Sequence, residues 1–314
     1  MPLEETGGAE TTLVVLTAGG FIKRVDLAEF DAQRRGGKGV VGAKPGEEDV
    51  ILRAVQSSGG DRVLCFTSLG MCHRLESTEI PVMSRYARGK KAASLLEPAD
   101  GEHVTYMLTY EGEFGDENLV LISSKGVIKR TALSNFKRMK AGGTKAMSLA
   151  EGDVICGGYV SATAQDAVIV TSSAKVVRCE ESDVRVMGKT AQGVRGVKLA
   201  EGDSVVAACP AYSGTNVLIV TERGFGKLTA HEEFRKTSRG AGGVTGSRLA
   251  DKTGKVAFAA TVGAQDVILF SRSGKFIRFP ASDVRETGRA AVGVRLMRME
   301  EPDAVAGGVV VTSG

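Results

Sequence analysis

The chain has 314 residues, of which 42% are hydrophobic and 25% are charged, a composition typical of a globular protein and not of a disordered one. Its 41 basic residues face 37 acidic ones, so the net charge of +4 is by itself weak evidence for a nucleic-acid partner. The apolar runs are far shorter than the about 20 residues that span a bilayer, and the five scattered cysteines and three separated histidines lack metal-ligand spacing, so we expect no membrane segment, metal or cofactor.

The N-terminal residues 1–10 are acidic and lack the apolar core of a signal peptide. We interpret them as a linker that precedes the folded part of the chain, residues 11–314. The cysteines include no CxxC pair and are odd in number, which is typical of reduced thiols. We therefore expect a cytoplasmic protein.

One pattern recurs along the rest of the chain. Each copy has an apolar run, a Thr or Ser, two residues, a glycine, an apolar pair and, in most copies, a basic residue; the first three copies span 14–24, 64–74 and 120–130. We call the glycine the marker. It stands at positions 20, 70, 126, 224 and 274, and Ala174 takes its place in the fourth copy. A short glycine-containing turn between two apolar runs predicts a β-hairpin in every copy.

Two further landmarks follow each marker at nearly fixed distances. Nineteen residues on, five copies have a glycine, whereas the third copy has Lys145. Further along, an aspartate precedes another apolar run in four copies: Asp49, Asp153, Asp203 and Asp303. Each unit is therefore predicted to contain a strand, a turn, a strand, a loop rich in glycine and basic residues, a strand, an acidic turn and a final strand.

Six such units predict an all-β fold, a six-bladed β-pinwheel that resembles a propeller, with about 50 residues and four strands per blade. The expected blades span approximately 12–58, 61–112, 117–163, 166–212, 215–262 and 265–312, within a single domain. We expect the ring to close by pairing of the last apolar run, 309–311, with the first, 13–15. A linear β-solenoid is the less favoured alternative, because 50 residues is long for one rung.

The loop of the first unit, residues 33–39, is the most distinctive segment of the chain. It contains three cations and three glycines within seven residues: Gln33, Arg34, Arg35, Gly36, Gly37, Lys38 and Gly39. Glycine lets a backbone approach a ligand closely, and arginine and lysine suit phosphate. The corresponding loops of the other five units also contain cations.

Equivalent positions of six blades lie at the same height in a closed ring, so these cations predict one basic belt. A belt fits a long polyanion better than a small ligand, and double-stranded DNA bent around the rim is the expected partner. Few aromatic residues (5%) are present to stack single-stranded bases, and no recognition helix is visible for base readout. Phosphate contacts without base specificity are therefore expected.

Residues 33–39 closely resemble the GyrA box of bacterial DNA gyrase A, and the six units resemble the C-terminal β-pinwheel domain of the same protein. The resemblance implies a hairpin-exchanged propeller that wraps DNA with positive handedness, so that the full enzyme introduces negative supercoils. It also implies three partners: DNA, the breakage-reunion core of gyrase A, and gyrase B with its ATPase, in an A2B2 complex at the bacterial nucleoid. The expected DNA-binding residues are Gln33, Arg34, Arg35, Gly36, Gly37, Lys38, Gly39, Arg88, Lys90, Lys91, Lys129, Arg130, Arg138, Lys140, Lys145, Lys189, Arg195, Arg239, Arg289 and Arg295.

Three alternatives remain open at this point. The related protein of topoisomerase IV has a similar domain, generally without an intact box and often with fewer blades. A protein-interaction propeller is the second alternative, although the repeat lacks Trp, as the whole chain does. An enzyme with a central pocket is the third, but no nucleophile–base pair and no G-x-x-x-x-G-K-[ST] loop occur. We expect no catalysis by this chain alone, ATP hydrolysis by a partner protein, and a monomeric isolated domain.

Overall fold

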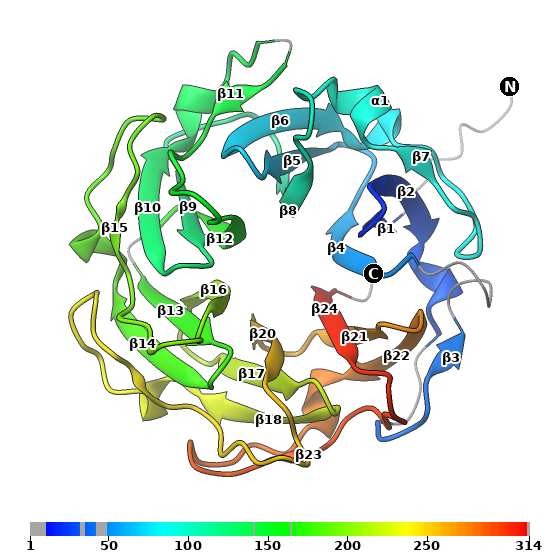
Figure 1. Ribbon diagram of the computed structural model, residues 1–314, viewed down its shortest axis with the longest axis vertical. Coiled ribbons are helices and arrows are strands. Elements are labelled where there is room, and N and C mark those ends of the chain that lie inside the picture. The colour runs from blue at the N-terminus through cyan, green and yellow to red at the C-terminus, as the bar shows by residue number, and fades with distance from the viewer. Residues whose placement is uncertain (1–10, 32–34, 42–48, 141, 164, 313–314) are drawn as a thin grey trace, which may run out of the picture.

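The recurrent hairpins of the sequence become the middle strands of six small antiparallel sheets, which a computed structural model arranges in a closed ring (Figure 1). The structure describes residues 11–31, 35–41, 49–140, 142–163 and 165–312, so the predicted linker 1–10 lies outside the described residues. Each sheet has four strands. The predicted all-β, six-bladed fold is confirmed.

The two middle strands of each sheet are joined by the marker turn. These pairs are β1 (Thr12–Thr17) with β2 (Phe21–Asp26), β5 (Asp61–Thr67) with β6 (Met71–Glu76), β9 (Asn118–Ser123) with β10 (Val127–Ala132), β13 (Asp166–Thr171) with β14 (Lys175–Glu180), β17 (Asn216–Thr221) with β18 (Phe225–Ala230), and β21 (Asp266–Ser271) with β22 (Lys275–Pro280). The marker adopts a left-handed backbone in all six turns, with φ of +76° at Gly20 and +59° at Ala174. This conformation explains why glycine recurs there.

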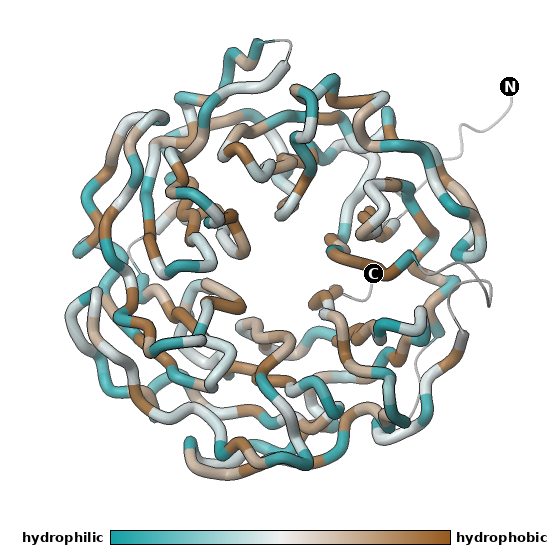
Figure 2. The backbone as a smooth tube through the Cα atoms, in the orientation of Figure 1, coloured by the Kyte–Doolittle hydropathy of each residue, from teal (hydrophilic) through white to brown (hydrophobic). Residues whose placement is uncertain are grey.

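The innermost strand of each sheet lies toward the centre of the ring (Figure 1). These strands are β4 (Ile51–Ser57), β8 (Val104–Glu111), β12 (Ile155–Ser161), β16 (Val205–Ala211), β20 (Val256–Val262) and β24 (Val305–Val311). Each pairs with the first strand of its own hairpin, as β4 does with β1. The hydrophobic colour of β4 in Figure 2 contrasts with the hydrophilic colour of many outer loops.

The outermost strands are short; five come from the next unit along the chain, and that of the last sheet comes from the first unit. They are β3 (Val40–Val41), β7 (Lys90–Lys91), β11 (Thr144–Lys145), β15 (Val194–Arg195), β19 (Val244–Thr245) and β23 (Val294–Arg295). The strand order β4-β1-β2-β7 shows the exchange, because β7 belongs to the second unit. A sheet therefore does not coincide with one sequence repeat.

The ring closes through β3 of the first unit, which pairs with β22 of the last sheet, Val40 opposite Phe276. The expected pairing of 309–311 with 13–15 is wrong. Both edges of β1 are already occupied, by β2 and β4, and β24 pairs with β21. The two apolar runs instead pack their side chains together in one core cluster, where Leu13 and Val15 join Val309 and Val311.

The hydrophobic core is divided into clusters that lie between neighbouring blades. The seam between the last and first blades shows the arrangement: Phe30 packs edge-on against Phe276, with 4.9 Å between the ring centroids. Because blades cover both faces of the middle strands, every residue of β1 is buried. A strand buried on both faces has a continuous apolar run and not an alternating pattern, as the sequence shows.

Short helices complete the units. A 3-10 turn follows the second strand of each hairpin: Leu27–Glu29, Ser77–Glu79, Leu133–Phe136, Glu181–Asp183, His231–Glu233 and Ala281–Asp283. The α-helix α1 (Ala93–Leu96) follows β7 in the second unit. Within the described ranges, no helix is long and apolar enough to cross a membrane.

The recurrent aspartates hold the marker turns. The backbone N–H of Gly19 donates to Asp49 Oδ1 (2.6 Å), and those of Ser173 and Ser273 donate to Asp203 and Asp303 Oδ1 (2.9 Å each). Lys125 donates in the same way to Asp153 Oδ1 (3.0 Å). The acidic landmark of the repeat is therefore a cap on a tight turn.

Acid should weaken this cap. Burial by itself raises the pKa of Asp203, but hydrogen bonds from Ser173, Ser172 and Thr171 outweigh it and lower the pKa to about 2. A depressed folded-state pKa stabilises the fold above the unfolded value of about 3.9 and loses that effect as pH falls toward 2. Asp203→Asn should lower the free energy of unfolding by about 1 kcal/mol at neutral pH, after allowance for solvent screening.

Urea denaturation at several pH values measures this difference. The gap between native and Asp203→Asn protein should narrow from about pH 4 to about pH 2. An unchanged gap across that interval would contradict the assignment of Asp203 as a charged cap.

Candidate nucleic-acid interface

The outer strands present a repeated cation at the rim of the ring. The second residue of four of the six is basic: Lys91, Lys145, Arg195 and Arg295. Three of these side chains are exposed, and that of Lys145 is partly exposed. The other two strands have Val41 and Thr245 there, so the belt is interrupted at β3 and β19.

Aromatic side chains of the preceding unit lie against two of these cations, Lys91 and Arg295, and against Arg88. The ammonium of Lys91 lies 4.0 Å and the guanidinium of Arg88 4.3 Å from the ring centroid of Phe21. Arg295 lies 5.3 Å from the ring of Phe225 in the same way. A cation over an aromatic face is oriented at little cost in hydration, so its charge stays available to a second ligand.

The first-unit loop joins the first unit to the last blade. Gln33 and Arg34 lie outside the described residues. In the described part, the N–H of Gly36 donates to the carbonyl of Leu296 (2.6 Å), and the N–H of Arg298 donates to the carbonyl of Gly37 (2.8 Å). The ammonium of Lys38 lies 2.9 Å from Glu300 Oε1. The loop therefore sits on the closing seam of the ring, beside β3.

Backbone shape explains the glycines of this loop. Gly36 and Gly39 have φ of +81° and +74°. A Cβ on Gly39 would lie 2.8 Å from both the carbonyl oxygen of Phe276 and Cε of Met297. Glycine is thus required at position 39 both for the left-handed backbone and for close contact with the last blade.

The remaining predicted residues differ in exposure. The side chains of Arg35, Lys38, Arg88, Lys90, Arg138 and Lys140 are exposed, whereas those of Arg130, Lys189, Arg239 and Arg289 are partly buried. Among the latter, Arg130 is ion-paired, with Nη1 3.6 Å from Glu181 Oε1.

Lys129 is the clear exception. It is 0% exposed, and its ammonium donates to the carbonyls of Ala146 (2.5 Å) and Lys189 (2.6 Å). This placement removes Lys129 from the surface set, because the neighbouring loop covers it.

The exposed cations that the sequence-based set missed include three that each lie 24 residues beyond their marker: Lys198, Arg248 and Arg298. Their backbone N–H groups donate to the loop of the following unit, at Ala241, Ala291 and Gly37 respectively. Their constant offset in three successive units was the signal that could have identified them. They add positive charge beside the rim loops.

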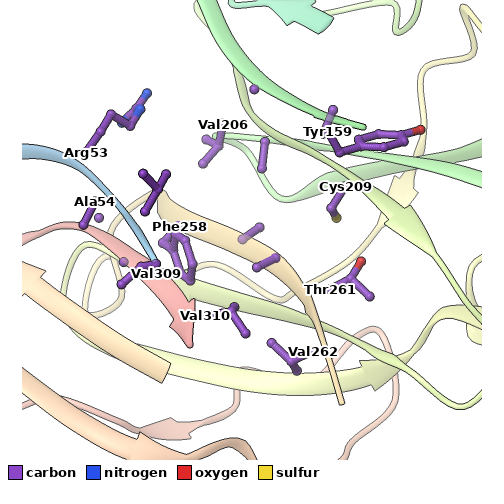
Figure 3. Close-up of a pocket in the computed structure, with 18 of the residues that line it drawn as sticks. Arg53, Ala54, Tyr159, Val206, Cys209, Phe258, Thr261, Val262, Val309 and Val310 are labelled. Atoms are coloured by element: carbon purple, nitrogen blue, oxygen red, sulfur yellow. The ribbon is translucent and has the colours of Figure 1, made fainter. Parts of the chain in front are cut away.

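The centre of the ring contains an apolar cavity of about 350 Å³, lined by all six inner strands (Figure 3). Burial raises the pKa of the Cys156 thiol to about 12 and that of Cys209 to about 11. Burial, with Glu181 nearby, also holds the pKa of Tyr159 well above its usual value. These groups stay protonated at neutral pH, which makes them poor nucleophiles.

Within the described residues, no group of three or more His, Cys, Asp or Glu side chains is arranged to hold a metal ion. The exposed cations that recur on the outer strands make the rim the candidate interface.

A family model described as "DNA gyrase C-terminal domain, beta-propeller" matches residues 11–56, 61–109, 117–155, 165–208, 215–262 and 265–312. DNA gyrase A of Haloquadratum walsbyi is 35% identical over 193 residues, and that of Salmonella typhimurium is 34% identical over 189 residues. Each alignment covers 60% of this chain and 22% of the relative, so the chain matches about a fifth of the length of these relatives.

Two solved structures resemble the ring. A DNA gyrase A C-terminal domain superposes with a TM-score of 0.87 at 25% identity, over 96% of this chain and 99% of that one. The C-terminal domain of a DNA topoisomerase IV superposes with a TM-score of 0.72 at 20% identity, over 98% and 95%. The second likeness is evidence for the fold alone.

Proposed function

Because this chain belongs to the family of DNA gyrase C-terminal β-propeller domains, we propose that it binds duplex DNA along its rim and bends the duplex around itself. It does so without base specificity and without cutting the DNA. The domain acts as part of a type IIA topoisomerase, in which wrapping supports the introduction of negative supercoils.

One observation carries the proposal. The same outer-strand position is basic in four blades of a closed ring, and further cations flank it: Lys91, Lys145, Arg195 and Arg295, beside Arg88, Lys90, Lys198, Arg248 and Arg298. Positions that are equivalent in a ring follow its circumference, so these charges favour a ligand that also follows it. A repetitive polyanion has that form.

The energetics require such a distributed contact. Bending roughly 40 base pairs through 180° costs about 11 kcal/mol, given a persistence length of about 150 base pairs. A single loop with three cations cannot offset that cost. Phosphate contacts around the rim, each releasing condensed counterions, can do so.

The first-unit loop favours gyrase over topoisomerase IV as the parent enzyme. The described box residues, 35–39, supply exposed cations and close the ring at the same place. We therefore propose that the domain belongs to gyrase A, with the breakage-reunion core of gyrase A and the ATPase protein, gyrase B, as partners in an A2B2 complex at the bacterial nucleoid. The isolated domain is expected to be monomeric, and ATP is bound by gyrase B.

Salt dependence of duplex binding tests the role of the rim. Changing Lys91, Lys145, Arg195 and Arg295 to Gln should reduce the slope of log affinity against log salt by about 3 to 4, because each lost phosphate contact removes about 0.9. The affinity should fall for every DNA sequence alike. Fluorescence anisotropy of a labelled 40-base-pair duplex at several salt concentrations gives the slope.

The matched control neutralises Lys252 and Lys255, two exposed lysines in the turn before β20. In this control, the slope of log affinity against log salt should change little for each charge removed. An equal change per charge in the two variants would mean that only net charge matters and would contradict a rim site. Duplex binding that is absent altogether, with salt-independent capture of a protein, would favour the interaction-propeller alternative.

A further inference from the structure

Three lysines of the ring are buried at one position of the repeat. Lys23, Lys129 and Lys227 each lie three residues beyond their marker, in units one, three and five. Their exposed fractions are 6%, 0% and 1%. A buried ammonium is costly unless hydrogen bonds compensate it, so its partners are informative.

The partners are carbonyl groups of the rim loop in the following unit. Lys23 Nζ donates to the carbonyl of Arg85 (2.7 Å), Lys129 Nζ to that of Lys189 (2.6 Å), and Lys227 Nζ to that of Arg289 (2.7 Å). Each acceptor stands 15 residues beyond its own marker, and each is itself basic. Lys23 and Lys227 have second acceptors in the same loop, such as the carbonyl of Gly288 for Lys227 (2.7 Å), whereas the second acceptor of Lys129 is the carbonyl of Ala146 in its own unit (2.5 Å).

The other three units have different residues at this position: His73, Val177 and Ile277. The lysine contacts therefore alternate around the ring. The first-unit loop comes after the last unit in the ring, and that unit has Ile277 and no lysine at this position. The same alternation shows that the fold accepts an apolar side chain there, since Val177 and Ile277 are both buried.

We propose that Lys23, Lys129 and Lys227 are positioning residues that hold alternate rim loops in the arrangement that contacts DNA phosphates, and that the hold depends on their charge. The inference rests on the proposed function of the rim. Each ammonium fixes the backbone of a basic residue, Arg85, Lys189 or Arg289, and so restricts where that residue's side chain can reach.

The surroundings set the pH range in which the charge is lost. Burial lowers the pKa of all three lysines to about 8. Nearby charges act in both directions: Glu29 opposes the shift at Lys23, Lys145 adds to it at Lys129, and Arg289 adds to it while Glu233 opposes it at Lys227. Asp49, Arg85 and Arg88 also line the small cavity beside Lys23.

Release of the loops by lysine deprotonation can be distinguished from global unfolding, because the two would change the stability of the fold with pH in opposite directions. Unfolded lysines keep their protons to about pH 10.4, so the unfolded state binds more protons than the folded state between about pH 8 and pH 10. Global stability contributed by these groups therefore rises over that interval. Weaker DNA binding in the same interval is then a local effect on the loops.

The test compares the native domain with a Lys23→Met, Lys129→Met, Lys227→Met variant, in which every rim cation is retained. From about pH 7 to about pH 9.5, the salt slope of the native domain should shrink by about 0.9 for each rim cation released. The variant should show the reduced slope at both pH values. The α-amino group also titrates near pH 8 but is present in both proteins, so a transition that persists in the variant would overturn the proposal.

Amide hydrogen exchange without DNA separates this inference from the proposed function. Exchange in residues 84–88, 188–190 and 288–290 should be faster in the variant. Residues 238–240, the equivalent loop of the fifth unit, should be unchanged, because the preceding unit has Val177 and not lysine at this position. If exchange in all four loops is the same in the variant as in the native domain, the proposal is overturned even if the rim binds DNA. Faster exchange with no duplex binding by the native domain would instead reject the proposed function. If the triple variant fails to fold, the single variant Lys227→Met and the salt slope of the native domain as a function of pH provide the test. A native salt slope that does not change with pH would overturn the proposal.

Discussion

Replacing residues 33–39 with alanine should nearly abolish DNA wrapping and leave duplex affinity within about tenfold of the native value, since only a few of the rim's phosphate contacts are lost. The described part of this loop makes two backbone hydrogen bonds to the last blade, through Gly36 and Gly37. It also carries the exposed cation Arg35. We expect wrapping to need contacts on both sides of the closing seam and binding to need only part of the rim.

Two partial variants separate the roles of shape and charge. Gly36→Ala with Gly39→Ala should disturb the seam, because both glycines have a positive φ and a Cβ at position 39 would meet the Phe276 carbonyl. Arg35→Gln with Lys38→Gln keeps the glycine backbone of the loop and removes its charge, together with the ion pair between Lys38 and Glu300.

The control is Gly240→Ala with Gly243→Ala in the equivalent loop of the fifth unit, which also has positive φ values. Supercoiling of relaxed circles by the assembled enzyme and anisotropy of a labelled duplex report wrapping and binding separately. Equal losses from the first-unit and fifth-unit variants would contradict a special role for the seam.

Gly224→Ala should lower the free energy of unfolding by more than about 3 kcal/mol. A loss this large is expected from a steric clash and not from a substitution at an open surface position. Gly224 has φ of +77°, and a Cβ there would lie 2.0 Å from the carbonyl oxygen of Met297. The N–H of Leu296 also donates to the Gly224 carbonyl (2.8 Å). The marker turn and the segment after β23 are thus in direct backbone contact, with no room for a methyl group.

Gly20 is the matched control for this prediction. Its φ of +76° is almost the same, but no atom lies within 4 Å of a Cβ placed there. Gly20→Ala should therefore cost only the strain of a left-handed alanine, about 1 to 2 kcal/mol. Ala174 shows that the turn itself accepts alanine, at φ of +59°. Urea denaturation of the two variants measures the difference, and equal losses would show that backbone strain, not the clash with Met297, explains the glycine.

The sequence was sufficient to predict the ring because the signal repeats. Six hairpins with nearly the same marker spacing predict six blades, and the left-handed turns explain the marker glycines. The closure was not predictable from the same pattern. The closing strand, Val40–Val41, has only two residues, too few to show any periodicity, and it pairs with a strand more than 200 residues away.

The candidate interface was predictable only in part. Cation positions follow from the repeat, but their exposure depends on which loop of the next unit covers them. Lys129 and Lys91 both lie in β-strands, β10 and β7. Lys129 is nevertheless buried and donates to the Lys189 carbonyl, whereas Lys91 is exposed and lies over the ring of Phe21. That distinction arises from strand exchange between units, which no local pattern encodes.

Ligation of nicked circular DNA in the presence of the isolated domain tests the central claim most directly. A domain that wraps the duplex around its rim constrains writhe, so the ligated circles should show a linking-number shift that grows with domain concentration, is positive in sign, and is lost when residues 33–39 are replaced with alanine. Circles with an unshifted linking-number distribution at saturating domain, under conditions where anisotropy shows the duplex to be bound, would contradict wrapping.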